Sequence, residues 1–213
     1  MDILGKLFGS EAKVRIMRLF LFNGELSFTN EDVAERTKTS ISVTRHELTV
    51  LRQMKLVRRK SFLKRVLRKK GKASTFVSVR TQGWILDTSF AYFLELQRLL
   101  IDVSLLRGNE LIRRLHTSGR LKLLITAGIF IQNSDSRVDL LVVADNLKRG
   151  ALEHAIRGIE SEIGKELKYA AFETTEFNYR LGMYDKLVRD ILDYPHTVVL
   201  DRLGLPPLKE EGR

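Results

Sequence analysis

Apolar residues in the N-terminal third of the chain recur at helical spacing between polar turns. Ser10 is a good helix-capping residue, and the apolar positions after it predict a helix that the pair Asn23-Gly24 ends. Thr29 and Asp32 form a variant of the capping box, which predicts a second helix of about two turns. The pattern therefore predicts two helices that each bury one apolar face.

A third helix is predicted from about Ser42 to Met54, after a short polar turn. Its buried stripe combines Thr44, Leu48 and Leu51, with Glu47 at the border. The opposite face carries hydrogen-bonding side chains, namely Ser42, Arg45, His46, Thr49 and Arg52. A short helix, a tight turn and a helix with such an outer face predict a helix-turn-helix, whose second helix enters the major groove of DNA.

Beyond this helix the pattern changes to that of strands. Residues Val57 to Leu67 and Thr75 to Val79 are rich in strand formers, and Arg68 to Lys72 form a predicted hairpin tip with Gly71 for the turn. A basic hairpin directly after a helix-turn-helix predicts a wing that contacts phosphates. The candidate phosphate contacts are Lys64, Arg65, Arg68, Lys69, Lys70 and Lys72.

The net charge of +11 is concentrated in this region. Residues 1–83 hold 19 Lys or Arg and 7 Asp or Glu, a balance of +12, whereas residues 84–213 hold 18 and 19, a balance of −1. Lys55 to Lys72 include ten basic residues and no acidic one. Such a segment attracts polyanions, so double-stranded DNA is the expected partner. A solvated basic loop without a partner is the alternative.

The segment from Ser40 to Val57 (SISVTRHELTVLRQMKLV) resembles the recognition helix and strand entry of ArsR-type winged helix-turn-helix regulators. The resemblance covers roughly residues 8–83 and implies a DNA-binding domain over residues 1–83. Family members often have Gly where Lys55 stands. Metal-sensing members use Cys or His clusters, whereas this chain has no Cys and four scattered His.

Residues 84–108 are predicted to form a connector that contains a helix from Ser89 to about Leu106. This helix is more apolar than an exposed linker would be, which favours burial between domains or in a dimer interface. Because winged-helix regulators commonly read paired half-sites as two-fold dimers, a homodimer is expected.

Residues 109–205 predict a small α/β domain, which makes the overall fold class α+β. Continuous apolar runs at Leu121–Thr126 and Val138–Val143 predict covered strands, and Leu147–Ile163 is an amphipathic helix. A third strand is expected over Tyr169–Thr174, with Thr175 as the cap of the next helix. Residues 206–213 are polar and are expected to be a disordered tail.

This part of the chain resembles the minimal nucleotidyltransferase family, which is polymerase-beta-like. The matching segments are Leu124–Ile129 (LITAGI) and Ser136–Val143 (SRVDLLVV). The family pattern has Gly-Ser and Asp-x-Asp at these sites, and its carboxylates hold metal ions. Here Gly128 is present but Ile129 replaces Ser, and Asp139 matches the second carboxylate but Arg137 replaces the first. An arginine at this position would repel Mg²⁺, and Arg137 is expected to pair with Asp139 instead.

These departures predict a degenerate domain with no catalytic residue, no bound metal and no cofactor, which would serve packing, dimerisation or the sensing of a nucleotide or protein. The absence of Cys and of a signal-peptide pattern favours the cytoplasm, and no apolar run is long enough for a membrane helix. A sequence-specific transcription regulator is the leading hypothesis. Two others stay open: a nucleotidyltransferase whose winged helix brings the substrate, and an antitoxin-like protein-interaction module.

Overall fold

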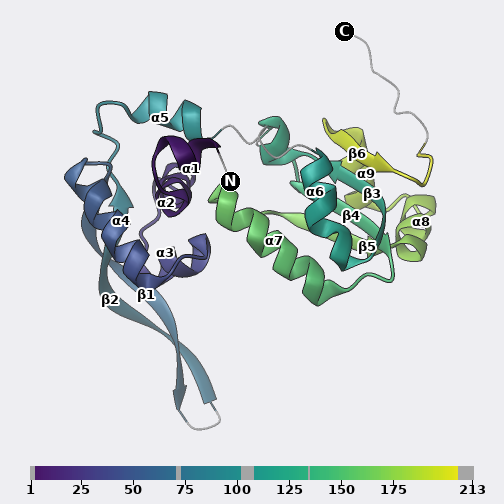
Figure 1. Cartoon of the computed structure of the whole chain (residues 1–213). Coiled ribbons are helices and arrows are strands. Elements are labelled where there is room, and N and C mark those ends of the chain that lie inside the picture. Colours follow the sequence, from purple (N-terminus) through teal and green to yellow (C-terminus); the bar gives the residue numbers. More distant parts are fainter. Residues whose placement is uncertain (1–2, 71–72, 102–107, 134, 206–213) are drawn as a thin grey trace. The chain divides into compact units, whose positions relative to one another are not determined.

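The computed structural model describes residues 3–70, 73–101, 108–133 and 135–205, apart from the side chains of residues 68–70 and 73. The chain divides into two compact units. The first unit comprises the described residues up to Ile101 together with Glu160–Lys165, and the second comprises the other described residues. Helices and strands occur in both units (Figure 1), so the predicted α+β class is confirmed.

In the described residues four helices precede the first strand, and two of them begin directly after the predicted capping residues Ser10 and Thr29. The four helices are α1 (Ile3–Leu7), which was not predicted, α2 (Glu11–Phe22), α3 (Asn30–Thr37) and α4 (Ile41–Gln53). The Ser10 hydroxyl accepts a hydrogen bond from the Lys13 N–H at 3.1 Å. The Thr29 hydroxyl accepts from the Asp32 N–H at 3.2 Å, and the Asp32 carboxylate accepts from the Thr29 N–H at 2.9 Å. Both predicted caps are therefore confirmed.

Three threonines fix the turn between α3 and α4. The Thr39 hydroxyl lies 2.8 Å from that of Thr37 and 2.7 Å from that of Thr44, and the Thr37 hydroxyl also donates to the Val33 carbonyl. Thr37 and Thr44 are fully buried, so their hydroxyls need these partners. The network joins the end of α3 to the first turn of α4.

Strands β1 (Val57–Lys70) and β2 (Ala73–Leu86) form an antiparallel hairpin in which Val57 is opposite Leu86. The predicted end of the second strand at Val79 is wrong, because Trp84 pairs with Phe28 through two backbone hydrogen bonds of 2.8 and 2.9 Å. Gly83 permits this approach, since a Cβ there would lie 2.4 Å from the Phe28 carbonyl oxygen. The expected boundary after residue 83 therefore falls inside β2.

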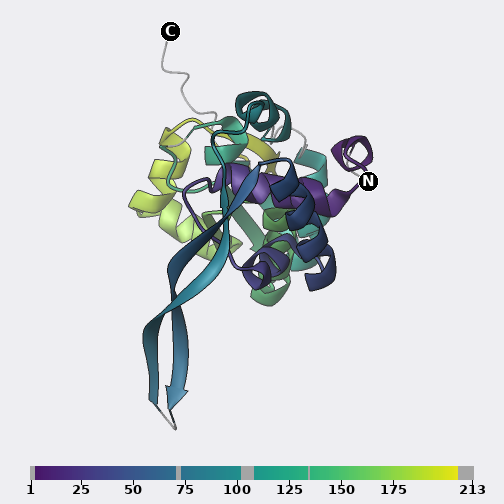
Figure 2. The same ribbon diagram turned by 90° about the vertical axis from the view of Figure 1, so that its left-hand side faces the viewer.

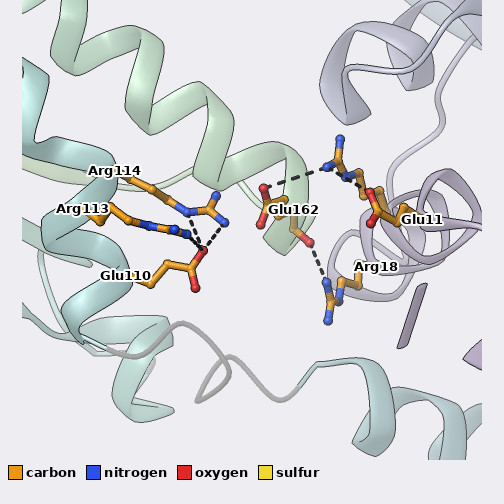
Figure 3. A network of polar contacts seen from close by, with 7 residues as sticks. Glu11, Arg18, Glu110, Arg113, Arg114 and Glu162 are labelled. Atoms are coloured by element: carbon orange, nitrogen blue, oxygen red, sulfur yellow. Dashed lines mark hydrogen bonds and ion pairs between the residues drawn. The ribbon is translucent and has the colours of Figure 1, made fainter. Parts of the chain in front are cut away.

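Residues 84–101 belong to the first unit and do not form a separate connector. Trp84, Leu86 and Leu100 are buried in its core, and Phe93 packs against that core from α5 (Phe93–Leu100). Of the helix expected over residues 89–106, the described part is helical only from Phe93 to Leu100. Residues 102–107 lie outside the described residues. Arg18, buried on α2, donates to the Leu100 carbonyl at 3.0 Å. It also donates to the Glu162 carbonyl at 3.2 Å (Figure 3).

The second unit is built on a sheet with strand order β5-β4-β3-β6. Its strands are β3 (Arg120–Thr126), β4 (Leu140–Asp145), β5 (Tyr169–Glu173) and β6 (Thr197–Asp201). Its helices are α6 (Gly108–Leu115), α7 (Arg149–Ile163), α8 (Thr174–Gly182) and α9 (Lys186–Asp193), with short 3-10 turns η2 (His116–Ser118) and η3 (Gly128–Ile131). β3 pairs antiparallel with β4 and β6, whereas β4 and β5 are parallel and joined through α7.

Both faces of this sheet are covered, as the continuous apolar runs predicted. Leu123 and Leu141 form one core with Phe177 of α8 and Val188 of α9. Leu124 and Val142, on the opposite face of the sheet, are equally buried. Helices α6 and α7 lie over that face (Figure 1). Intrahelical ion pairs of Glu110 with Arg113 and Arg114 occupy the surface of α6 (Figure 3).

Some boundaries of the second unit differ from the predicted ones. Val138 and Asp139 precede β4 instead of starting it, and α8 begins at Thr174, so Thr175 is not its cap. Residues 206–213, the expected tail, lie outside the described residues. Within residues 3–70, 73–101, 108–133 and 135–205, no helix combines the length and apolar character needed to cross a bilayer.

Candidate nucleic-acid interface

Helix α4 separates a buried stripe from an exposed polar face. Thr44, Leu48 and Leu51 are fully buried, as predicted. Glu47, expected at the border, is buried as well, and its carboxylate lies 3.7 Å from the Lys13 ammonium of α2. The predicted outer-face residues are all exposed: Ser42, Arg45, His46, Thr49 and Arg52.

The exposed face of α4 presents both hydrogen-bond donors and acceptors. The Thr49 hydroxyl donates to the Arg45 carbonyl at 2.8 Å, which leaves its oxygen lone pairs on the surface. Arg45 and Arg52 add planar guanidinium groups that can bind two acceptors at once. Ile41 and Val43, also exposed, give the first turn of the helix an apolar component suited to a thymine methyl group.

The end of α4 is fixed by a Schellman arrangement that leads straight into β1. The Leu56 N–H donates to the Leu51 carbonyl at 2.9 Å, and the Lys55 N–H donates to the Arg52 carbonyl at 3.0 Å. Leu51 and Leu56 are both fully buried, which supplies the hydrophobic contact of this motif. Lys55 has a φ of 62°, in the left-handed region that favours glycine. The hairpin therefore starts from a rigidly defined point at the end of α4.

Lys64 anchors the hairpin to α3. Its ammonium group donates to the Asp32 carboxylate at 2.5 Å, and both side chains are partly buried. Burial raises the pKa of the Asp32 carboxyl, but the hydrogen bonds from Lys64 and Thr29 outweigh this effect and hold that pKa below its ordinary value of 3.8. Lys64 thus has a structural partner, whereas Arg65, the next candidate, is exposed.

The remaining candidate phosphate contacts lie at the far end of the hairpin. The backbones of Arg68, Lys69 and Lys70 continue β1, so the predicted tip over residues 68–72 is shorter than expected. The side chains of these three residues and the whole of Lys72 lie outside the described residues. In Figure 1 and Figure 2 the hairpin extends well beyond α3 and α4.

Further exposed cations on the hairpin were not among the candidates. Arg58, Arg59, Lys60 and Arg80 are all exposed. Arg80 was missed because the second strand was expected to end at Val79. The guanidinium of Arg59 stacks 3.7 Å above the Trp84 ring, which holds it in place. Since the sequence from Leu48 to Leu86 contains no Asp or Glu, these cations share a stretch without negative charge.

The nucleotidyltransferase-like motif of the second unit is brought together only in part. Asp139 is buried, with 6% of its surface exposed. Its carboxylate accepts hydrogen bonds from the Ile129 N–H and the Lys168 N–H, each at 2.9 Å. Gly128 lies against it, because a Cβ there would come within 2.1 Å of the Asp139 Oδ1. Asp139 therefore ties the loop after β3 to the entry of β5.

Arg137 does not pair with Asp139, so that expectation is wrong. Its guanidinium forms an ion pair with Asp190 of α9 instead. Glu173, the last residue of β5, accepts from the Leu147 N–H at 2.7 Å. In the part of the chain that the structure describes, no three His, Asp or Glu side chains gather in a way that could hold a metal ion.

Comparisons of the chain with family models, curated proteins and solved structures find no match.

Proposed function

We propose that the first unit is a winged helix-turn-helix domain that binds double-stranded DNA and that the protein is a cytoplasmic transcription regulator. The main support is the exposed polar face of α4, which leads directly into a cationic hairpin. The hairpin lies in a stretch that contains no acidic residue. In this proposal α4 lies in the major groove with Arg45 on base edges, and the hairpin lies along phosphates. Ser42, His46, Thr49 and Arg52 complete the helix surface.

The second unit is proposed to be non-catalytic. Its one motif carboxylate, Asp139, is buried and accepts two backbone hydrogen bonds, and within the described residues no three His, Asp or Glu side chains gather in a way that could hold a metal ion. The test is Mg²⁺-dependent incorporation of a labelled nucleotide by the purified protein. We expect no turnover above that of the Asp139→Ala variant, and turnover that this substitution abolishes would reverse the assignment.

A homodimer is proposed through α5 and the residues just before it. Tyr92, Leu94 and Leu99 are exposed there by 68%, 58% and 46%. Burying such side chains in a two-fold interface removes apolar area from water and would pair two α4 helices for two half-sites. Light scattering at tens of micromolar protein should give the mass of a dimer, and a monomer would contradict this part of the proposal.

DNA binding is tested with duplexes that the protein selects from a random-sequence library. The affinity should fall steeply with salt, because each neutralised phosphate contributes a slope of about −0.9 to log K against log salt. Arg45→Ala should cost about 1–3 kcal/mol on the selected duplex and relax preference at one base pair. The matched control is Lys186→Ala, which removes an exposed cation from the second unit and should leave affinity unchanged.

Two results would contradict the proposal at different levels. Affinity that is absent or independent of salt would exclude DNA as the partner. Equal binding to all duplexes, with no effect of Arg45→Ala, would exclude sequence-specific reading by α4 while leaving non-specific binding in place.

A further inference from the structure

The outer part of the hairpin carries an apolar pair among its cations. Leu67 of β1 and Phe76 of β2 are directly opposite each other, and antiparallel partners lie on the same face of the ribbon. Leu67 is 49% exposed and Phe76 is 62% exposed. The guanidinium of Arg65 lies 5.2 Å from the centre of the Phe76 ring. One face of the ribbon therefore presents a leucine and an aromatic ring beside a positive charge.

This pair lies well beyond the anchor of the hairpin. Lys64, which binds Asp32, is three residues before Leu67 and six before the end of β1 at Lys70. At about 3.3 Å per residue, the pair lies roughly 10 Å past the anchor, and the end of β1 lies roughly 20 Å past it. That length is comparable with half of a DNA helical repeat, roughly 17 Å, which separates a major groove from the neighbouring minor groove.

The charge of the ribbon decides between two classes of partner. A second protein chain would bury this pair in an interface core, and lysine is depleted in such interfaces. The hairpins of two copies of this chain would also repel each other, because the stretch from Leu48 to Leu86 holds basic residues and no acidic one. A nucleic acid suits both features of the hairpin. Its phosphates neutralise the cations, and its stacked bases offer an apolar surface to the leucine and the phenylalanine.

We propose that the outer part of the hairpin lies in the DNA minor groove. There it inserts the Leu67–Phe76 pair as a wedge between base pairs, so that the duplex bends. Apolar wedges of this kind partly unstack one base step, at a cost of a few kcal/mol, and kink the duplex toward the major groove. The inference rests on the proposed DNA binding and adds an architectural role to it. Arg65 would then hold the ring in place and face a phosphate.

Bending is measured by energy transfer between dyes at the two ends of a short duplex selected by the protein. The full-length wild type should bring the ends closer, and Leu67→Ala and Phe76→Ala should each reduce this change. Because a mismatch lowers the cost of unstacking, the wild type should bind a duplex with a central mismatch about tenfold more tightly than the intact duplex. Phe76→Ala should lose that preference, and Phe76→Leu should keep much of it.

The matched control is Tyr179→Ala, which removes an aromatic side chain of similar exposure, 69%, from the second unit. It should leave both the bend and the mismatch preference unchanged, and thermal unfolding should show that all variants are folded. A wild type that binds without bending, or a bend that survives Phe76→Ala, would overturn the wedge alone. Loss of self-association in Phe76→Ala without DNA would assign the pair to a protein interface and overturn it too. Absence of salt-dependent binding would instead overturn the proposed function itself.

Discussion

The two units use their charged side chains in different ways. In the first, Arg45 and Arg65 are exposed in or beside a stretch that contains no acidic residue. In the second, Arg137 pairs with Asp190 and the Asp139 carboxylate is held by two backbone N–H groups. An exposed polar group is open to a ligand, whereas a buried polar group that is hydrogen-bonded to the backbone holds the fold together. The exposed cations of the first unit therefore suit the proposed binding surface, whereas the charged groups of the second unit form a structural network.

Asp139→Ala gives the largest expected effect and tests the structural side of this comparison. Hydrogen bonds to a charged group contribute about 1.5–3 kcal/mol each, so losing two and leaving buried N–H groups without an acceptor should lower the free energy of unfolding by about 3 kcal/mol or more. Denaturant unfolding of the full chain, followed by circular dichroism, measures this loss.

The control for that substitution is Glu153→Ala on α7. Glu153 is exposed and forms a surface ion pair with Arg157, so its removal should cost no more than about 0.5 kcal/mol. If the two variants unfold at the same denaturant concentration, Asp139 does not tie the loops together and its carboxylate is available for another role.

Asp32→Asn tests a carboxylate that anchors the hairpin of the first unit to α3. The substitution removes the ion pair with Lys64 and weakens the capping box, which should cost about 1 kcal/mol at neutral pH. Because the pKa of Asp32 is lowered in the folded state, its contribution is full above its ordinary pKa of 3.8 and disappears as the pH falls through the lowered value. The difference in unfolding free energy between wild type and variant should therefore narrow below pH 3.8.

Urea titrations over a pH series measure this difference. Glu31→Gln, an exposed substitution in the same first turn of α3, should leave the pH dependence of the wild type unchanged. A gap between wild type and Asp32→Asn that stays constant through the acidic range would show that the ionised carboxylate does not anchor the hairpin.

Much of the first unit follows from local chemistry and was predictable. Ser10, Thr29 and Asp32 mark helix starts because their side chains bond to backbone N–H groups a few residues away. The outer face of α4 follows from its period of 3.6 residues. Such signals lie within one or two helical turns, so a single sequence contains them in full.

The features that were missed depend on residues far apart in the chain. The true length of β2 is set by Phe28, which pairs with Trp84. The burial of Trp84, Leu86 and Leu100 depends on the core that α2 and α4 provide. Arg137 was expected to pair with Asp139 because they are close in sequence, but α9 brings Asp190 to it. Periodicity and spacing describe neighbours along the chain, and they do not rank partners from distant elements.

Lys55→Gly gives the smallest expected effect and tests the junction that carries the hairpin from α4. A non-glycine residue in the left-handed region costs about 1–2 kcal/mol, while glycine in its place adds roughly 0.5–1 kcal/mol of backbone entropy to be lost on folding. Lys55→Gly should therefore stabilise the first unit by about 0.5 kcal/mol, which calorimetry would detect as a higher unfolding temperature. Lys55→Ala removes the same charge but keeps the Cβ, so it should give no gain. Equal unfolding temperatures for the two variants would mean that the φ of 62° at Lys55 stores no strain, and that the Schellman turn alone sets the direction of β1.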